Sequence, residues 1–313
     1  MENFYHVCFS TKKEAMFRNH EDHVAFVNCL ALALYSTNAK LYVDTEMSNH
    51  VHLGIGTEDP RPFIRNLRQR YTRHFNEKYF RSGRLGELET FCLKLEGHYH
   101  LLTAWSYILR NGMHHGICLL PFAYEYSTIR HIFKKAYHWD SIDTLITSRN
   151  EIAGCLPRRS EFPDEYVMDG AGMFVRECFT QIALVEASYG SPRSFDYFMT
   201  RLSSDASGEK WKEEQMKDNC GMDPITLEGM EALVVGGDKE DIGRIMKNEY
   251  GKFDDRRPSD EVICELIDKE YVPGFRRKSV YQLTDDEKVL IAKDLLNSRY
   301  LPADQISRCL VME

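Results

Sequence analysis

The sequence predicts an α+β protein. A ferredoxin-like antiparallel sheet with helices on one face is expected in residues 1–140, and a mostly α-helical domain in residues 166–313. Two observations lead to this prediction. In the first part, short segments rich in aromatic and β-branched residues alternate with segments of helical periodicity, whereas the second part shows helical periodicity alone. Residues 141–165 contain turn-forming residues without a clear period and are interpreted as a linker.

The predicted elements of the first part follow the order β-α-β-β-α-β-α. Glu21 and Asp22 open the first helix, where acidic side chains favour the positive end of the helix dipole. Pro62 marks the start of the second helix, and a third helix from His98 is stopped by Gly112. The expected strands cover residues 3–10, 39–43, 49–55 and 91–95.

The second part contains helical periodicity in residues 170–188, 226–235, 238–248, 259–269 and 284–296. Thr284 and Glu287 match the pattern of a capping box at the start of the last of these helices. The role of this domain stays open. The basic triplet Arg276, Arg277 and Lys278, together with the final helix pair, favours hairpin recognition or assembly.

Composition excludes several classes of protein. Of 313 residues, 43% are hydrophobic and 28% are charged, which is typical of a globular chain and not of a disordered or fibrous one. No apolar run is long enough to span a membrane, and the N-terminus lacks the pattern of a signal peptide, so a cytoplasmic protein is expected. The nine cysteines form no Cys-x-x-Cys pair, which argues against a disulfide framework or a thiolate zinc site.

The formal net charge of −8 hides an uneven distribution. Residues 1–140 hold 17 basic and 14 acidic side chains, a net of +3, which leaves 23 basic and 34 acidic side chains, a net of −11, in residues 141–313. All twelve histidines also lie in the first part. Because histidine binds metals and transfers protons near neutral pH, chemistry is expected there.

Two histidines stand two residues apart in a predicted strand. Side chains at positions i and i+2 of a strand point to the same face, so His50 and His52 are expected to project side by side. This spacing suits two ligands of one metal ion, although two histidines on a polar strand face would give the same pattern. A histidine-triad nucleotide hydrolase needs a third histidine, and Gly54 stands in its place.

A tyrosine and an asparagine lie one turn apart on the third helix. Tyr107 and Asn111 share a polar stripe with Thr103. This spacing would place a phenol nucleophile beside an amide ligand of a metal. The alternative is that Tyr107 is a boundary aromatic with its hydroxyl in water. His114 and His115 follow closely, either as auxiliary ligands or as surface loop histidines.

The second helix and the segment after it are strongly basic, with Glu77 the single acidic residue between positions 61 and 84. Cations neutralise phosphates and aromatic rings stack on unpaired bases, so the composition favours single-stranded or hairpin DNA as a partner over a solvated helix face. The basic candidates are Arg61, Arg65, Arg68, Arg70, Arg73, Lys78, Arg81 and Arg84, and the interleaved rings are Tyr71, His74, Phe75, Tyr79 and Phe80.

Together these residues resemble the HUH (histidine–hydrophobic–histidine) single-strand transposases of the insertion-sequence-200 type, especially the REP-associated tyrosine transposases. The resemblance covers residues 4 to about 130 and leaves the C-terminal part unassigned. Two departures concern DNA specificity: Gly112 replaces a frequent proline, and Leu85-Gly86-Glu87 replaces a tryptophan-containing motif. The motifs that carry the resemblance are Tyr5-His6-Val7, Met47–Leu53, Arg70–Asn76, Arg81–Leu85, Tyr107–Asn111 and Gly116.

The resemblance implies a role for each matching residue. His50, His52 and Asn111 would hold a divalent metal, Mg²⁺ or Mn²⁺. Tyr107 would attack a DNA phosphodiester, form a covalent 5′-phosphotyrosine and free a 3′-hydroxyl. The implied activity is DNA nicking and strand transfer on single-stranded hairpin ends, with no membrane partner.

Alternatives stay open. A domesticated or non-catalytic member would recognise repeated hairpins without transposition, and a metal-dependent hydrolase of small phosphoesters would use the histidine pair but leave the basic helix unexplained. Monomer or homodimer, the target DNA, and whether the tyrosine serves its own histidine pair or a partner's are not decided by the sequence.

Overall fold

The computed structural model describes residues 2–11, 13–88, 90–139, 144–200 and 258–312. The helices expected at 226–235 and 238–248 lie outside these residues. None of the helices within the described ranges combines the length and apolar character needed to cross a membrane.

The described chain contains a four-stranded sheet in the order β2-β3-β1-β4, with all neighbours antiparallel. The α+β class and the antiparallel sheet are thereby confirmed. β1 is central and pairs with β3 on one side and β4 on the other, so β2 and β4 are the edge strands. The strands are β1 (Asn3–Ser10), β2 (Lys40–Met47), β3 (His50–Thr57) and β4 (Phe91–Leu95).

One face of the sheet is covered by α1 (His20–Thr37) and α2 (Pro60–Lys78). Val7, Leu53 and Phe75 belong to the apolar core between these helices and the sheet. The N-terminus of α1 is capped by Asn19 and that of α2 by Asp59, whose side chains accept backbone N–H groups of the first turn.

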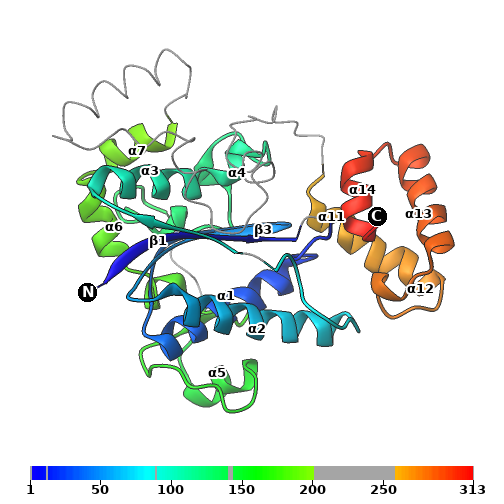
Figure 1. Ribbon diagram of the computed structural model, residues 1–313, viewed down its shortest axis with the longest axis horizontal. Coiled ribbons are helices and arrows are strands. Elements are labelled where there is room, and N and C mark those ends of the chain that lie inside the picture. The colour runs from blue at the N-terminus through cyan, green and yellow to red at the C-terminus, as the bar shows by residue number, and fades with distance from the viewer. Residues whose placement is uncertain (1, 12, 89, 140–143, 201–257, 313) are drawn as a thin grey trace.

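The opposite face is covered as well, which corrects the expectation of helices on one face. α3 (His98–Leu109) packs there, and Figure 1 shows α3 and α1 on opposite sides of the sheet. Alternation along β3 explains this arrangement: Val51, Leu53 and Ile55 face α1 and α2, so the residues between them face α3. Two apolar faces need two covering layers.

Gly54 allows α3 to approach the sheet closely. A Cβ at this position would lie 2.8 Å from Val43 Cγ2 and 2.9 Å from Trp105 Nε1. Trp105 is buried and stacks on Tyr42 with ring centroids 5.2 Å apart. The missing side chain at Gly54 therefore makes room for the tryptophan of the helix that carries Tyr107.

We expect Gly54→Ala to lower the free energy of unfolding by about 1–3 kcal/mol, because the added methyl overpacks the contact with Trp105. Urea denaturation measures this change. Gly154→Ala is the matched control, since nothing lies within 4 Å of the Cβ it adds in α5 (Arg149–Cys155) and helix propensity favours alanine by up to about 1 kcal/mol. Equal effects of the two substitutions would contradict this packing.

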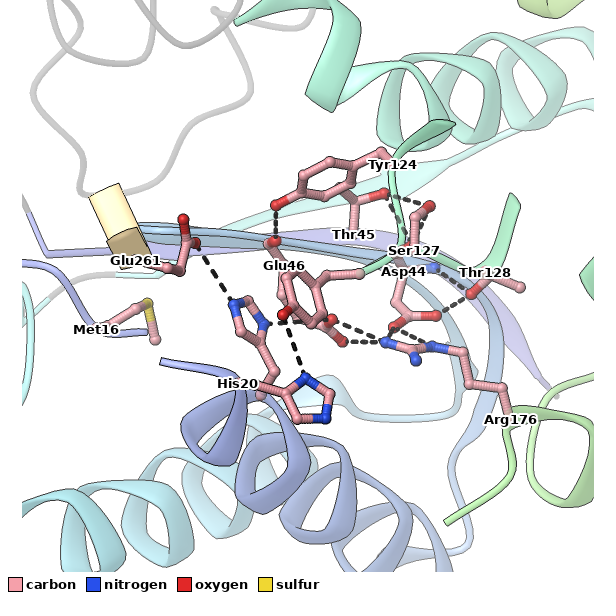
Figure 2. A network of polar contacts seen from close by, with 12 residues as sticks. Met16, His20, Asp44, Thr45, Glu46, Tyr124, Ser127, Thr128, Arg176 and Glu261 are labelled. Atoms are coloured by element: carbon pink, nitrogen blue, oxygen red, sulfur yellow. Dashed lines mark hydrogen bonds and ion pairs between the residues drawn. The ribbon is translucent and has the colours of Figure 1, made fainter. Parts of the chain in front are cut away.

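A buried polar network binds later segments of the chain to the edge strand β2 (Figure 2). Arg176 Nη2 lies 2.7 Å from Glu46 Oε1 and 3.1 Å from Asp44 Oδ2. Thr128 Oγ1 donates to the Asp44 carboxylate, and the Tyr124 hydroxyl donates to the Glu46 carbonyl at 2.6 Å. Burial raises the pKa of Glu46, and the Arg176 guanidinium acts in the opposite direction. The network ties residues far along the chain to this strand.

Residues that follow the predicted linker, 141–165, contribute to the core on both faces of the sheet. Met168 and Phe174 join the core on the α1 side, whereas Val185 and Phe195 join the core on the α3 side. Residues up to 200 therefore belong to the two layers around the sheet. They form β5 (Leu145–Ile146), α5, β6 (Met168–Asp169), α6 (Ile182–Tyr189) and α7 (Pro192–Thr200).

The helix expected at 170–188 is shorter than predicted, since it begins at Ile182. Gly172 takes a left-handed backbone conformation with φ +79°, which a continuous α-helix does not accommodate. The segment before α6 contains turns and a 3₁₀ turn at Arg176–Cys178.

The C-terminal unit, residues 258–312, has its own small core, to which Ile263, Leu295 and Ile306 contribute. The predicted capping box is confirmed: Thr284 and Glu287 exchange side-chain and backbone hydrogen bonds at the start of α13. The helices are α11 (Asp260–Leu266), continued by a π-helical turn (Ile267–Tyr271) and α12 (Val272–Gly274), then α13 (Asp285–Ser298) and α14 (Ala303–Leu310).

Arg18 joins the C-terminal unit to the sheet-containing part. Its guanidinium is fully buried, forms a bidentate pair with Asp268 at 2.8 and 2.9 Å, and donates to the Cys309 carbonyl at 2.8 Å. Figure 1 shows α11 and α14 at one end of the sheet. A buried, fully hydrogen-bonded arginine of this kind fixes orientation, because leaving it without its partner is costly.

Candidate active site and basic groove

His50 and His52 lie side by side on the α3 face of β3, as the strand period predicts. Their ring centroids are 5.1 Å apart and both side chains are buried. Neither imidazole is therefore exposed to water. Burial lowers the pKa of His50 to about 3, and it also lowers the pKa of His52. Both rings are neutral and can donate a lone pair to a metal.

Tyr107 and Asn111 reach the same place from the end of α3. Asn111 opens the short helix α4 (Asn111–His114), and its Oδ1 lies 3.2 Å from His50 Nε2. The ring of Tyr107 lies 5.4 Å from that of His52, centroid to centroid. A Cβ on Gly112 would lie 2.7 Å from Tyr124 Cγ, so a proline at this position would clash. The structure thus brings together all four residues of the predicted centre.

The contacts of His50 fit a metal ligand. Its Nδ1 lies 2.8 Å from Asn49 Oδ1, and its Nε2 faces Asn111 Oδ1. A neutral imidazole carries one N–H, so it can donate to one of these two amide oxygens. With the proton on Nδ1, where the contact is shorter, two lone pairs face each other at Nε2. Two ligands of one octahedral ion at about 2.1 Å and a right angle are about 3.0 Å apart, close to this spacing.

His6 is a neighbour of this centre to which the sequence assigned no role. Its Nε2 lies 3.0 Å from His52 Nδ1, and both rings are buried. This contact restricts the tautomer and the orientation of the His52 ring. His6 belongs to the Tyr5-His6-Val7 motif, but its partner lies on another strand. The pair follows only from the pairing of β1 with β3, in which Cys8 is opposite His52.

The donor set is small. No group of three or more His, Cys, Asp or Glu side chains in the described residues is arranged to hold a metal ion. The Asn111 amide oxygen is a further donor beside the histidine pair. His114 is buried with its ring stacked on Tyr107, whereas His115 is exposed and its ring lies 4.9 Å from that of His50.

Burial raises the pKa of the Tyr107 phenol, Cys8 acts in the same direction, and a hydrogen bond with Asn111 partly opposes both. The phenol is therefore protonated near neutral pH. A protonated phenol is a weak nucleophile, so positive charge close to the phosphate or the tyrosine oxygen is needed for attack.

The basic segment forms a groove of about 810 Å³ between α2 and the edge strand β4. Arg65, Arg73 and Arg84 line it and are exposed, and their guanidinium groups make no hydrogen bond or salt bridge to another described residue. Arg61 pairs with Asp59, and Arg68 donates to Thr90 and to backbone carbonyls of residues 87 and 88. Five of the seven predicted DNA-binding arginines thus share one groove.

The other two arginines have different surroundings. Arg70 donates to Asn66 on the same helix and does not line the groove. Arg81 is largely buried, pairs with Glu14 at 2.9 Å and donates to the Arg84 carbonyl at 2.7 Å. A side chain used in this way holds the loop together and is not available to a phosphate.

Most of the interleaved aromatic residues belong to the core. Tyr71 and Phe75 are buried, and Tyr79 donates to the buried Asp22 carboxylate at 2.7 Å. They recur every four residues on the face of α2 that packs on α1, so their spacing is that of a core stripe. Phe80, in contrast, is 55% exposed.

The groove and the tyrosine lie on opposite faces of the sheet at its β4 edge. Cys92 lines the groove, whereas its neighbour Phe91 contacts His6, with ring centroids 5.2 Å apart. Successive residues of a strand point to opposite faces.

No protein-family profile and no curated protein matches the chain. Among solved structures, it is similar to a REP-associated tyrosine transposase bound to a REP hairpin, with a TM-score of 0.39 and 8% identity over 43% of this chain and 81% of that chain. It is also similar to a candidate transposase of Deinococcus radiodurans R1, with a TM-score of 0.27 and 17% identity over 32% of this chain and 83% of that chain. Both of these structures are described as transposases.

Proposed function

We propose that the protein nicks and rejoins single-stranded DNA at hairpin ends through a covalent 5′-phosphotyrosine on Tyr107. The observation that supports this function best is the convergence of His50, His52 and Asn111 beside Tyr107 in one buried centre. Two neutral imidazoles and an amide oxygen would hold Mg²⁺ or Mn²⁺ and leave coordination positions free. The bound ion would supply Lewis acidity that polarises a phosphate oxygen.

The chain's own residues account for the rest of the reaction. The Tyr107 oxygen forms a bond to phosphorus as the bond from phosphorus to the 3′ oxygen breaks. The phenol loses its proton and the departing oxygen gains one, so the products are a phosphotyrosine and a 3′-hydroxyl. Because the phosphodiester energy is kept in the new bond, attack by another 3′-hydroxyl restores a DNA strand without an added energy source.

A hairpin flanked by labelled single strands tests this proposal. We expect a covalent adduct on a denaturing gel with Mn²⁺ or Mg²⁺ and none with EDTA. An intact duplex of the same sequence is the matched substrate and should give no adduct. Absence of an adduct, with DNA binding retained, would instead support the second candidate, a non-catalytic protein that recognises hairpins through the basic groove.

The C-terminal unit contacts the turn that precedes His50. Ser48 Oγ donates to Asp260 Oδ2 at 2.7 Å, and this buried carboxylate also pairs with Arg308 at 2.5 Å and accepts from Gln305 at 2.9 Å. Ser48 is two residues from His50. The contact therefore holds the start of β3 and positions the first histidine.

We expect Asp260→Asn to weaken Mn²⁺ binding about 10- to 100-fold, the usual cost of losing a residue that positions a metal ligand. Asp268→Asn is the matched control. It removes a carboxylate from the same interface, but the side chain of Asp268 pairs with Arg18 and not with the turn before β3. Titration calorimetry measures the affinity and thermal unfolding measures the stability. Equal loss of affinity in both variants would show a general effect of domain docking and contradict a positioning role.

A further inference from the structure

A second pocket, of about 560 Å³, lies where the segment after α2 meets the C-terminal unit. Lys13, Phe80 and Arg84 line it from the sheet-containing part, and Tyr281 and Met312 line it from the C-terminal unit. Its volume falls in the range of roughly 300–1,000 Å³ usual for small-ligand sites. We propose that this pocket binds an unpaired nucleotide of the DNA strand, with Phe80 as the stacking surface. The proposal rests on the DNA-binding function proposed above.

Phe80 occupies a position that normally takes glycine. It follows Tyr79, the C-cap of α2, with φ +52°, and the next amide, of Arg81, donates to the Asn76 carbonyl at 2.9 Å. These are the features of a Schellman cap, in which the left-handed residue is usually glycine because a side chain there is strained. The chain thus keeps a large, 55% exposed ring at a position that disfavours any side chain.

Positive charge surrounds this ring. Lys278 Nζ of the C-terminal unit lies 5.0 Å from the centroid of the Phe80 ring, a cation–π contact. The cationic side chains of Lys13 and Arg84 line the pocket, and so does one of its two acidic residues, Glu87. The remaining acid, Glu14, is already paired with Arg81, at 2.9 Å. An exposed ring between cations suits a base with its phosphates, since stacking tolerates any base and the cations bind the backbone.

The pocket floor is held in place across the two parts of the chain. The Glu14 carboxylate accepts from Arg81 and from the Tyr281 hydroxyl, the latter at 2.7 Å, and the Arg81 guanidinium lies over the Tyr281 ring at 5.5 Å. A floor built in this way is formed before a ligand arrives, which lowers the cost of binding.

Arg84 lines both this pocket and the groove along α2. The two hollows therefore have this side chain in common, and a strand of nucleic acid in the groove would pass beside the pocket. This proximity favours a nucleotide over an acidic peptide, which the charges alone would also attract. It also gives the C-terminal unit a share in DNA recognition.

Phe80→Gly separates this role from folding, because glycine removes the backbone strain as it removes the ring. We expect this variant to unfold at no lower temperature than the wild type, yet to bind a fluorescein-labelled hairpin with single-stranded flanks about 5- to 100-fold more weakly. Fluorescence anisotropy in EDTA measures binding without cleavage. Phe80→Trp should restore the affinity, and 2-aminopurine in the flank should be quenched by the wild type and not by Phe80→Gly.

Tyr300→Leu is the matched control, an 87% exposed aromatic residue with φ +55° that does not line the pocket. It should bind as the wild type does. Unchanged DNA affinity in Phe80→Gly, with a wild type that binds, would overturn the nucleotide pocket and leave the proposed function intact. The nucleotide pocket would also be overturned if Phe80 were needed for binding of an acidic peptide and not for binding of DNA. A wild type that binds no DNA would overturn both proposals.

Discussion

Replacing Tyr107 by phenylalanine should abolish the covalent DNA adduct, a loss of more than about a thousandfold, because the attacking oxygen is removed. The ring remains, so its contacts with the rings of His52 and His114 are kept and the fold should be unaffected. Mn²⁺ affinity and DNA affinity should stay within about twofold of the wild type. Gel detection of the adduct and anisotropy of the labelled hairpin measure these two properties separately.

Tyr99→Phe is the matched control for this variant, since Tyr99 lies on the same helix two turns earlier. It should form the adduct at the wild-type rate. His50→Ala and His52→Ala should lose both the adduct and most of the Mn²⁺ affinity, which distinguishes a ligand from a nucleophile. An adduct that persists in Tyr107→Phe would show that another residue attacks the DNA.

The second large effect is expected in the basic groove. Changing Arg65, Arg73 and Arg84 together to glutamine removes three exposed cations whose guanidinium groups form no hydrogen bond or salt bridge within the described part of the chain. We expect the affinity for single-stranded DNA at low salt to fall on the order of tenfold. The slope of log affinity against log salt should fall by about 2, because each phosphate contact to a single strand contributes about 0.7.

Arg70→Gln is the control for the groove, because this arginine lies on the same helix but outside the lining. Its salt slope should match that of the wild type. If the triple variant kept the wild-type slope, the groove would not be a phosphate track, and the basic residues of α2 would be a solvated helix face.

Local patterns predicted the strand pair and the helix pair of the candidate site. The two-residue period of β3 places His50 beside His52, and one helical turn separates Tyr107 from Asn111. What local patterns did not predict is the face on which α3 lies. That depends on the absence of a side chain at Gly54, which is a contact between distant segments.

Local sequence patterns do not predict contacts between residues far apart in the sequence, for the same reason. His6 meets His52 through strand register, and Arg18 meets Asp268 across 250 positions of sequence. Nothing local to either residue indicates its partner. The aromatic residues of α2 are a different case: Tyr71 and Phe75 lie on one face of this helix by their spacing, and that face is buried in the core.

The identity of the attacking residue is the most direct test of the central claim. After reaction with the hairpin substrate and digestion with trypsin and nuclease, the segment from Leu95 to Arg110 should carry a nucleotide, as cleavage after Lys94 and Arg110 releases it. Fragmentation should place the nucleotide on Tyr107 and not on Tyr99, the other tyrosine of this peptide. A nucleotide on any other residue, or none in the presence of Mn²⁺, would contradict the account.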